Sequence, residues 1–380
     1  MAYNIGLTGP YPYDADIKSD LFAAAVNFYP NRTPLVSRLP NYPSAANVIK
    51  AVDDKYRPSK DTVNMANGIT NNATSLVLTD GTFLNVGDVL SLDSEAVQVT
   101  AVDAANHTAT ITRAYGSSIA VAHNNSITAY LIATAGTGAD VDLSANIRQF
   151  DTTLTYPQTV QHAYQIGGSL EGKSGNAAIP MGMSSFVTYQ VAKAMMEVLD
   201  DFERSIYYGV PQAISSNTAR PMMCGIQNRL TTNMTTSPTN ASAYKPSDLE
   251  RDLFQTAYAG GGQPDVMVCS TDFRQGFVVW GVNLLLLRPG DTDFGIDIEV
   301  WQSPVVNAKI IFAPLLRSGT AFALTSEEVY MAWAREVFDK PRGSRGDAIE
   351  GDIIGEGSVV VNNEAHHAWV QGVTGFAKQS

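Results

Sequence analysis

The sequence predicts an α+β fold, and three observations lead to this prediction. One stretch has the spacing of a long amphipathic helix, others have the residue types and turns of antiparallel strands, and the two kinds are mixed without repeated strand–helix–strand units. At 380 residues the chain is long enough for two or three domains, and 44% hydrophobic residues suit a globular protein with a substantial core. We therefore expect several compact parts that combine helices with antiparallel strands.

The composition argues against several classes of function. Only 16% of the residues are charged and the formal net charge is −12, whereas proteins that wrap nucleic acid need clustered Lys and Arg. The most apolar run, "VNLLLL" at 282–287, is far shorter than the about 20 residues of a membrane helix. The N-terminus lacks the pattern of a signal peptide, and Cys224 and Cys269 form no close-spaced pair. We expect a protein made in a reducing cytoplasm, without membrane contact.

The first 45 residues read as an extended N-terminal arm. They contain several prolines and little periodicity beyond a possible short helix around "IKSDLFAAAVNFY". A terminal segment of this kind is ordered only where it rests on another surface. Docking is favoured over a disordered tail by its apolar residues, which include Leu21, Phe22, Val26, Phe28 and Leu35.

Residues 67–133 differ in character from the rest of the chain. Short β-rich runs such as "SLVLTDGTF" and "TATITRAY" are separated by turn residues. Lys is absent from this stretch, and Arg113 is its only fixed positive charge. These features predict a small all-β barrel or sandwich inserted into another domain. Polar extended segments at 46–66 and 134–178 flank the insert, and they are able to pair with each other as one long hairpin.

The strongest helix prediction covers about 184–208. Apolar residues recur there at spacings of three and four and form one stripe: Val187, Val191, Met195, Val198, Phe202 and Ile206. Ser184 or Ser185 can cap the helix, and Gly209 can end it. A second helix is predicted in "KPSDLERDLFQTAYAGGG", where Ser247 and Glu250 match a capping box. Strand-like segments dominate the remainder, including two long closing strands.

One short stretch matches a phosphate-binding pattern. Gly167, Gly172, Lys173 and Ser174 fit G-x-x-x-x-G-K-[ST], the loop with which nucleoside triphosphatases cradle phosphates. That loop requires a helix directly after the lysine, but "SGNAAIPMGM" places glycines and Pro180 in its first turns. We interpret Gly167–Ser174 as a mobile turn and keep a P-loop NTPase as an alternative.

Other candidate sites are equally weak. The stretch "DTDFGIDIE" carries acidic residues at alternate positions, as a half-exposed strand would, and Gly295 is one place short of the glycine position in a calcium loop. His366 and His367 are adjacent and would face opposite sides of a strand. The sequence therefore predicts no catalytic, cofactor-binding or metal-binding residues, no cofactor and no enzyme activity.

Five segments together resemble the major capsid proteins of tailed bacteriophages, in the branch of the major head protein of Roseophage-type podoviruses. They occur in the family's order and span most of the chain: "NFYPNRTPLVSRL" (27–39), "ANIRQFDTTLTYPQTVQHAY" (145–164), "ARPMMCGIQNRLTTN" (219–233), "AYAGGGQPDVMV" (257–268) and "VVVNNEAHHAWVQGV" (359–373). The stretch "VGDVLSLDSEAVQVTAVDAANHTATITRAYGSSIAVAH" is also similar to a small β-module that recurs as an insertion in phage structural proteins.

The resemblance implies the Hong Kong 97-type capsid fold, with an inserted small all-β domain. Its parts would be the N-terminal arm at 1–45, the extended loop at 46–66 and 134–178, the inserted domain at 67–133, the peripheral domain at 179–245 and 319–380 with its spine helix near 184–208, and the axial domain at 246–318. The phosphate-loop pattern would then lie at the base of the extended loop.

The resemblance also implies a function and partners. Hexamers and pentamers of the chain would close the icosahedral head shell of a virion around double-stranded DNA, without sequence-specific binding. Assembly would occur in the host bacterial cytoplasm, with portal, scaffolding and possible decoration or cement proteins as partners. No long N-terminal scaffolding segment is recognised, and no crosslinking residues can be assigned. The alternative within the same fold is the shell of an encapsulin-like protein nanocompartment.

Overall fold

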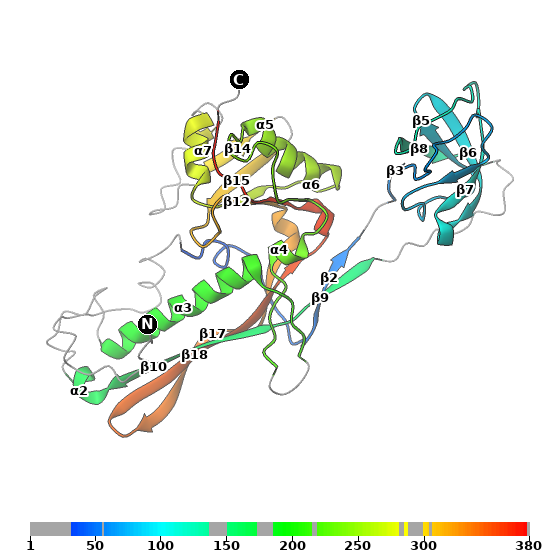
Figure 1. Ribbon diagram of the computed structural model, residues 1–380. Coiled ribbons are helices and arrows are strands. Elements are labelled where there is room, and N and C mark those ends of the chain that lie inside the picture. Colours follow the sequence, from blue (N-terminus) through cyan, green and yellow to red (C-terminus); the bar gives the residue numbers. More distant parts are fainter. Residues whose placement is uncertain are drawn as a thin grey trace. The chain divides into compact units, whose positions relative to one another are not determined.

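The computed structural model describes residues 32–54, 57–136, 150–172, 185–214, 219–280, 285–287, 299–303 and 306–377. The chain divides into two compact units, Met1–Asp53 with Thr152–Ser380, and Asp54–Asp151. The first unit mixes helices and strands, whereas the described part of the second consists of strands and one 3₁₀ turn, η1 (Ala104–Asn106) (Figure 1). The fold class is α+β, as predicted. The first 31 residues of the expected arm lie outside the described residues.

The longest helix, α3, spans Phe186–Tyr208, where the sequence predicted a helix over about 184–208. Ser185 is its N-cap, and its hydroxyl accepts a 3.2 Å hydrogen bond from the backbone N–H of Thr188. The carboxylate of Glu171, in the one-turn helix α2 (Gly168–Glu171), accepts from the N–H groups of Phe186 and Val187. Two side chains therefore satisfy the exposed amides at the start of α3.

Helix α3 packs on a four-stranded sheet in the first unit (Figure 1). The order of its strands is β1 (Asn41–Pro43), β17 (Val329–Arg345), β18 (Ala348–Val361) and β10 (Gln158–Gly167). Strand β18 is antiparallel to both neighbours, and β1 runs parallel to β17. The apolar stripe of α3 packs here, with Val187 and Met195 partly buried and its other residues buried, and the rings of Phe202 and Trp333 are 4.9 Å apart. At Gly355 a side chain would collide with Phe202, so glycine permits this close approach.

A second, seven-stranded sheet has the order β11, β19, β16, β12, β15, β14, β13. Its strands are β11 (Met234–Thr235), β12 (Val266–Cys269), β13 (Leu285–Leu287), β14 (Glu299–Gln302), β15 (Asn307–Phe312), β16 (Ala321–Leu324) and β19 (Ala368–Val370). Strands β16 and β19 lie outside the range 246–318 expected for the axial domain. Both are fully buried runs that pair antiparallel with each other, so the sheet draws on the C-terminal part of the chain.

Short helices accompany this sheet and share a second hydrophobic core with it. They are α5 (Pro246–Leu249), the π-helical turn η4 (Glu250–Gln255), α6 (Thr256–Ala259) and α7 (Phe273–Trp280). The predicted capping box was misplaced by two residues. Lys245 is the N-cap, Pro246 takes the first helical position, and Asp248 accepts from the Lys245 N–H at 3.2 Å.

The two segments flanking the insert pair over a shorter length than the predicted long hairpin. Strand β2 (Ile49–Asp53) pairs with β9 (Asp151–Thr155) in a two-stranded sheet. Beyond Pro157 the second segment continues as β10, which pairs with β18 over ten residues. The apolar residues Val160 and Ile166 of β10 are buried in that position, and burial in the four-stranded sheet explains why this segment leaves β2.

The second unit is a closed six-stranded β-barrel. Its sheet order is β3 (Lys60–Thr62), β8 (Thr128–Thr134), β5 (Asp88–Leu92), β6 (Glu95–Asp103), β7 (Thr108–Thr112) and β4 (Ser75–Val77). The edge strands meet just beyond their ends, where the N–H of Asn64 donates to Val77 and that of Thr79 to Thr62. Thirteen buried hydrophobic residues fill the interior. Because closure removes free strand edges, the unit is protected against edge-to-edge association.

Candidate functional site

The phosphate-loop pattern adopts a different local structure from a phosphate cradle. Gly167 ends β10, which pairs antiparallel with β18 instead of lying in a parallel sheet. Helix α2 begins inside the pattern at Gly168, whose N–H donates to the backbone carbonyl of Asp347 at 2.5 Å. A side chain at Gly168 would meet the Asp347 carboxylate. An acid therefore lies where a phosphate would need positive potential, and Lys173 and Ser174 lie outside the described residues.

The described residues were also compared with the requirements of a metal site, a reactive cysteine and a membrane span. Among them, no group of three or more His, Cys, Asp or Glu side chains could hold a metal ion. Of the acidic run after Pro289, Asp291, Asp293 and Asp297 lie outside the described residues, and Glu299 begins β14. Both cysteines are buried. No described helix is long and apolar enough to cross a membrane.

A buried carboxyl group holds the end of the N-terminal arm on α3. Residues 32–39 form a turn whose Leu35, Val36 and Leu39 belong to the hydrophobic core of the first unit. The two carboxylate oxygens of Glu203 accept hydrogen bonds from the backbone N–H groups of Leu35 at 3.0 Å and Val36 at 2.8 Å. The hydroxyl of Tyr207, one turn later in α3, donates to the same carboxylate. Glu203 therefore binds backbone groups of the arm.

The electrostatics of this anchor are unusual because Glu203 is fully buried. Burial raises the pKa of Glu203 to about 7, although the hydrogen bonds from Tyr207, Val36 and Leu35 act to lower it, and the nearby Asp200 raises it further. Arg32 instead forms an ion pair of 2.6 Å with Asp200. Burial also disfavours the charged form of Arg38 and lowers its pKa, while the nearby Glu203 acts to raise that pKa. The anchor therefore changes charge close to neutral pH.

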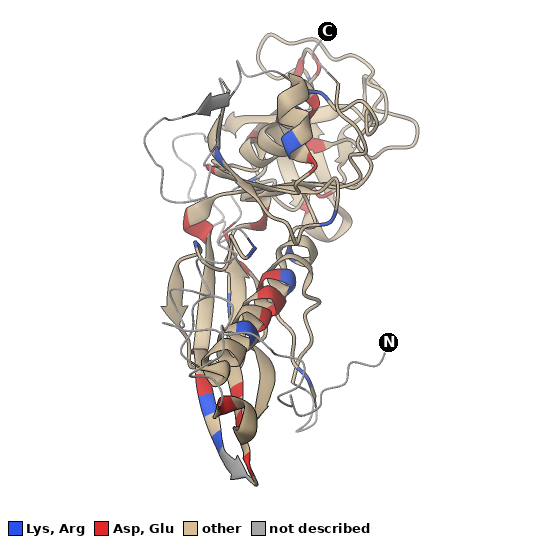
Figure 2. Cartoon of the chain, turned by 90° about the vertical axis from the view of Figure 1, so that its left-hand side faces the viewer, with Lys and Arg blue, Asp and Glu red and all other residues tan. Residues whose placement is uncertain are grey.

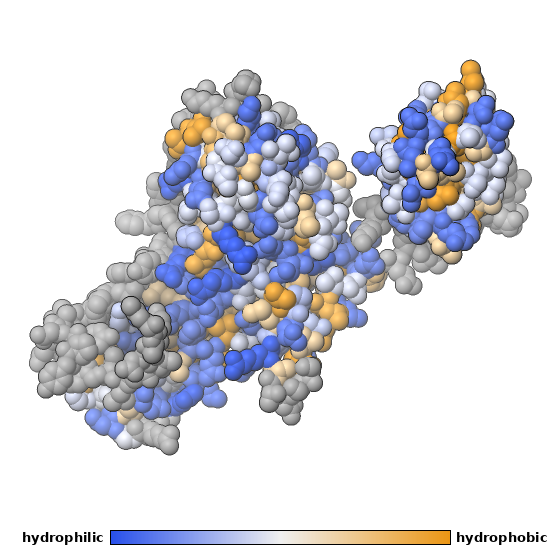
Figure 3. Space-filling model, in the orientation of Figure 1, coloured by the Kyte–Doolittle hydropathy of each residue, from blue (hydrophilic) through white to orange (hydrophobic). Residues whose placement is uncertain are grey.

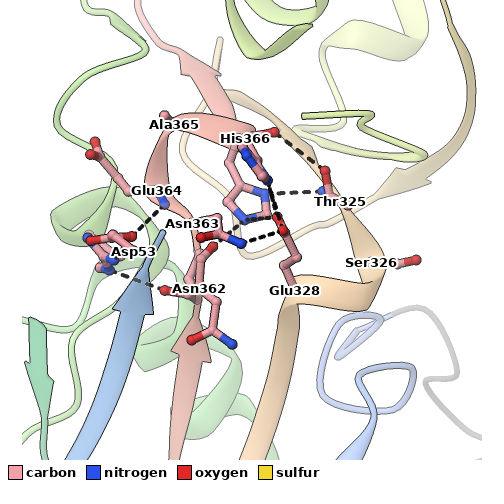
Figure 4. A network of polar contacts seen from close by, with 12 residues as sticks. Asp53, Thr325, Ser326, Glu328, Asn362, Asn363, Glu364, Ala365 and His366 are labelled. Atoms are coloured by element: carbon pink, nitrogen blue, oxygen red, sulfur yellow. Dashed lines mark hydrogen bonds and ion pairs between the residues drawn. The ribbon is translucent and has the colours of Figure 1, made fainter. Parts of the chain in front are cut away.

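A second polar cluster, the 362–367 junction, connects segments of the first unit that are far apart in the sequence, among them residues near Asp53 and Glu328 (Figure 4). The side-chain oxygen of Asn362 accepts from the N–H of Val52 in β2 at 3.0 Å, and the N–H of Asn363 donates to the carbonyl of Val52 at 2.8 Å. Asn363 adopts a left-handed backbone conformation with φ 47°, which asparagine tolerates better than most residues. Its side-chain amide donates to Glu328 at 2.7 Å.

The adjacent histidines occupy different environments within the junction. His366 donates to Glu328 at 2.8 Å through Nδ1. His367 is fully buried, with Nδ1 accepting from the N–H of Thr325 and Nε2 donating to the carbonyl of Asn362. Burial lowers the pKa of His367 to about 4, so it is neutral at physiological pH. Both histidines act as structural hydrogen-bonding groups here.

The other side of the junction contains a buried ion pair. Arg229, at the end of α4 (Ile226–Arg229), contacts Asp53 of β2 at 2.5 Å and donates to the carbonyl of Val361. Asp53 also accepts from the N–H of Glu364 at 2.8 Å. Burial acts to raise the pKa of Glu364, but hydrogen bonds from Thr231 and Thr232 outweigh it and lower that pKa. The network fixes the strand that leads to the insert.

The side of α3 that faces the viewer in Figure 2 carries acidic residues between two basic ones. Asp201 contacts Arg204 at 2.5 Å and His162 of β10 at 2.9 Å. These groups are partly exposed, and each such pair contributes at most about 1 kcal/mol. The face therefore suits solvent or polar contacts and is not a basic surface for nucleic acid.

The barrel has its own buried polar cluster around Glu95. Arg113 donates to both carboxylate oxygens, at 2.7 and 2.6 Å, and His123 contacts the same group at 3.0 Å. Burial acts to raise the pKa of Glu95, but hydrogen bonds from Arg113, His123, Val121 and Ala114 outweigh it and lower the pKa to about 2. The ionised carboxylate ties the segment 113–123 to the barrel. The cluster is structural.

Sequence reasoning missed the anchor and the junction. Glu203 lies beside the predicted apolar stripe of α3, and an isolated Glu in a helix ordinarily faces solvent. The junction joins residues more than 300 positions apart. Only its composition, with polar "NNEAHH" between two apolar runs, hinted at a structured turn.

Comparison with protein families gives one extended match. The family model described as SU10 major capsid protein matches residues 8–374, which is nearly the whole chain. A search of curated proteins found no match.

Several solved structures are similar to the chain at low identity. A chain of the Cyanophage A-1(L) capsid has a TM-score of 0.47 at 8% identity, with 97% of each chain covered. The virus-like particle from Pyrococcus furiosus has a TM-score of 0.44 at 8% identity, covering 92% of this chain and 96% of that one. An encapsulin complex from Synechococcus elongatus has a TM-score of 0.41 at 12% identity, covering 61% and 81%.

Proposed function

This chain belongs to the family of SU10 major capsid proteins, and from that membership we propose how its parts act in a shell. Copies of the chain build the head shell of a tailed bacteriophage, and its location is the virion. Its α+β arrangement, with a long helix on a long hairpin and a separate mixed sheet, is the Hong Kong 97-type capsid fold that the resemblance implied. The single observation that carries this function is the family match over residues 8–374. It excludes the encapsulin-like alternative.

In this proposal, the arm and the extended loop make the contacts between copies of the chain. The anchor at Glu203 supports this role for the arm, because its hydrogen bonds to Leu35 and Val36 fix the end of the arm on α3. The 362–367 junction supports the same role for the loop, since it fixes β2 at the loop's base. The helix α3 and the four-stranded sheet would form the peripheral domain, and the seven-stranded sheet the axial domain.

The chain is a structural protein, and we propose that it has no catalytic activity. The acid beside Gly168 and the antiparallel pairing of β10 support this proposal against a P-loop NTPase. We assign no catalytic, cofactor-binding or metal-binding residues.

The subunits associate with one another, and we propose further partners. Portal, scaffolding and decoration proteins are the expected ones in an assembling head. The negative net charge of the chain supports a shell that encloses double-stranded DNA without binding it tightly.

Truncation of the arm tests whether the arm makes contacts between copies. Deleting residues 1–30 keeps the anchored turn, so the variant should remain soluble and unfold cooperatively while forming fewer closed shells. Sedimentation, electron microscopy and urea unfolding of the full chain and the variant give the comparison. An unfolded variant would place the arm in the subunit's own core instead.

A further inference from the structure

The end of the N-terminal arm is a buried apolar turn. Its residues Leu35, Val36 and Leu39 are at most 9% exposed and belong to the same hydrophobic core as α3, whereas hydrophilic residues cover much of the visible surface of the first unit in Figure 3. The backbone N–H groups of Leu35 and Val36 donate to the two carboxylate oxygens of Glu203. Because these hydrogen bonds join the turn to α3, a change in the charge of Glu203 acts directly on the end of the arm.

The surroundings of Glu203 are poor in positive charge. No Lys or Arg in the described part of the chain forms an ion pair with this carboxyl group, because Arg32 pairs with Asp200 and Arg38 interacts only at longer range. Asp200 lies one turn earlier in α3 and is 5% exposed, and its Oδ1 atom is buried without a hydrogen-bond partner among the described residues. An ionised Glu203 is therefore a buried charge without a counter-ion, close to a second carboxylate.

The neighbouring titratable groups do not supply the missing charge. Tyr207 donates to Glu203 from one turn later in α3, and Tyr207 in turn interacts with Tyr208 and with the buried Cys269 of β12. Charged side chains on elements packed against α3 make polar contacts with other partners: His162 of β10 with Asp201 and Glu197, Arg335 of β17 with Glu356 of β18, and Arg229 of α4 with Asp53. A proton is therefore the cation that can neutralise Glu203 in place.

We propose that Glu203 is a proton-controlled latch on the arm: the neutral carboxyl group holds the turn 32–39 on α3, and loss of its proton favours opening of the turn. A neutral carboxyl group can still accept from both amides, because its two oxygens keep lone pairs. An ionised carboxylate regains its hydration only when the turn moves away. Burial, opposed by the hydrogen bonds from Tyr207, Val36 and Leu35, raises the pKa of Glu203 to about 7, which places the change near neutral pH.

In a shell, this latch would couple assembly to pH. The coupling rests on the proposed function, in which the arm makes contacts between copies of the chain. An arm whose end is fixed on α3 loses less conformational freedom when it binds a neighbour. Closed shells should therefore form more readily at a pH of about 6 than at a pH of about 8, and Glu203→Gln, which cannot ionise, should reduce the difference.

Amide hydrogen exchange in unassembled full-length subunits measures the latch itself. The pKa of Glu203 is higher in the closed turn than its ordinary value of 4.5, so opening releases protons and becomes more favourable as pH rises. After division by the intrinsic exchange rate, the opening equilibrium at Leu35 and Val36 should rise about tenfold between pH values of about 6 and 8. It should stay constant in Glu203→Gln, whereas the control Glu336→Gln, exposed on β17, should behave as the original chain.

A second variant keeps the test decisive if Glu203→Gln does not fold. Tyr207→Phe removes a hydrogen bond that lowers the pKa of Glu203, so the pH at which opening levels off should move upward, which a purely structural tyrosine would not cause. The latch is wrong if opening at Leu35 and Val36 does not change with pH in the original chain, or if Glu203→Gln keeps the change.

Sedimentation and electron microscopy of the same proteins at both pH values test the coupling to assembly. Equal yields of closed shells at the two pH values, with a normal exchange response, would overturn the coupling. The absence of shells at both values would instead contradict the proposed function, while the exchange response would still support the latch.

Discussion

The carboxylate of Glu203 accepts a 3.0 Å hydrogen bond from the backbone N–H of Leu35, although the two residues are 168 positions apart. The bond joins the end of the N-terminal arm to the central helix of the first unit. Because a carboxyl group binds it, this contact depends on pH in a way that an apolar contact would not.

Glu203 should make the subunit less stable as pH rises through neutrality. The pKa of about 7 in the folded state lies above the ordinary value of 4.5, so between these values the folded state binds more protons than the unfolded state. The free energy of unfolding therefore falls as pH rises from about 5 to 8, by up to about 3 kcal/mol. In Glu203→Gln, which resembles the protonated acid, the dependence should be flatter.

Urea unfolding of unassembled full-length subunits at several pH values measures this effect. Glu336→Gln, on the exposed side of β17, is the control and should retain the dependence of the original chain. Parallel curves for the original chain and Glu203→Gln would show that Glu203 does not titrate in this range.

The buried ion pair between Arg229 and Asp53 should be costly to break from one side. Arg229→Met leaves a buried carboxylate without its cation and should destabilise the subunit by about 3–5 kcal/mol. Arg229→Met combined with Asp53→Leu should recover much of this loss, because neither member of the pair is left as an unpaired buried charge. Arg335→Met removes a partly exposed pair with Glu356 and should cost less than about 1 kcal/mol. Equal effects of the two single substitutions, measured by urea unfolding, would contradict a special role for the junction.

Lys173 should be irrelevant to nucleotide chemistry. Since α2 begins within the phosphate-loop pattern and an acid lies beside Gly168, purified protein should release phosphate from ATP only at the rate of a buffer blank. Lys173→Ala should leave that rate unchanged. Hydrolysis that is abolished by this substitution would revive the NTPase interpretation.

Local patterns predicted the parts of this molecule that depend on near neighbours. The apolar stripe of α3 packs along the four-stranded sheet, and its serine cap forms at Ser185. The change in composition after residue 66 predicted a β-rich segment. The strands of the barrel do lie in this segment, but the first of them begins earlier, at Lys60.

Long-range pairing could not be predicted in the same way. Strand β10 could pair with the first flank of the insert or with a strand nearly 200 residues later, and only burial of Val160 and Ile166 decides between these partners. The prediction of a capping box at Ser247 was wrong because Pro246 fits the first helical position. The helix therefore starts two residues closer to the N-terminus, with Lys245 as its N-cap. Glu203 was missed because its partners are backbone groups of a distant turn, which have no sequence signature.

The central claim is that this chain is the building block of a closed head shell. Electron microscopy of the full-length protein, expressed alone and together with a candidate scaffolding protein, tests it most directly. We predict closed icosahedral particles of uniform size in at least one of the two preparations. Folded subunits that remain monomeric or form only small oligomers in both preparations would contradict the claim.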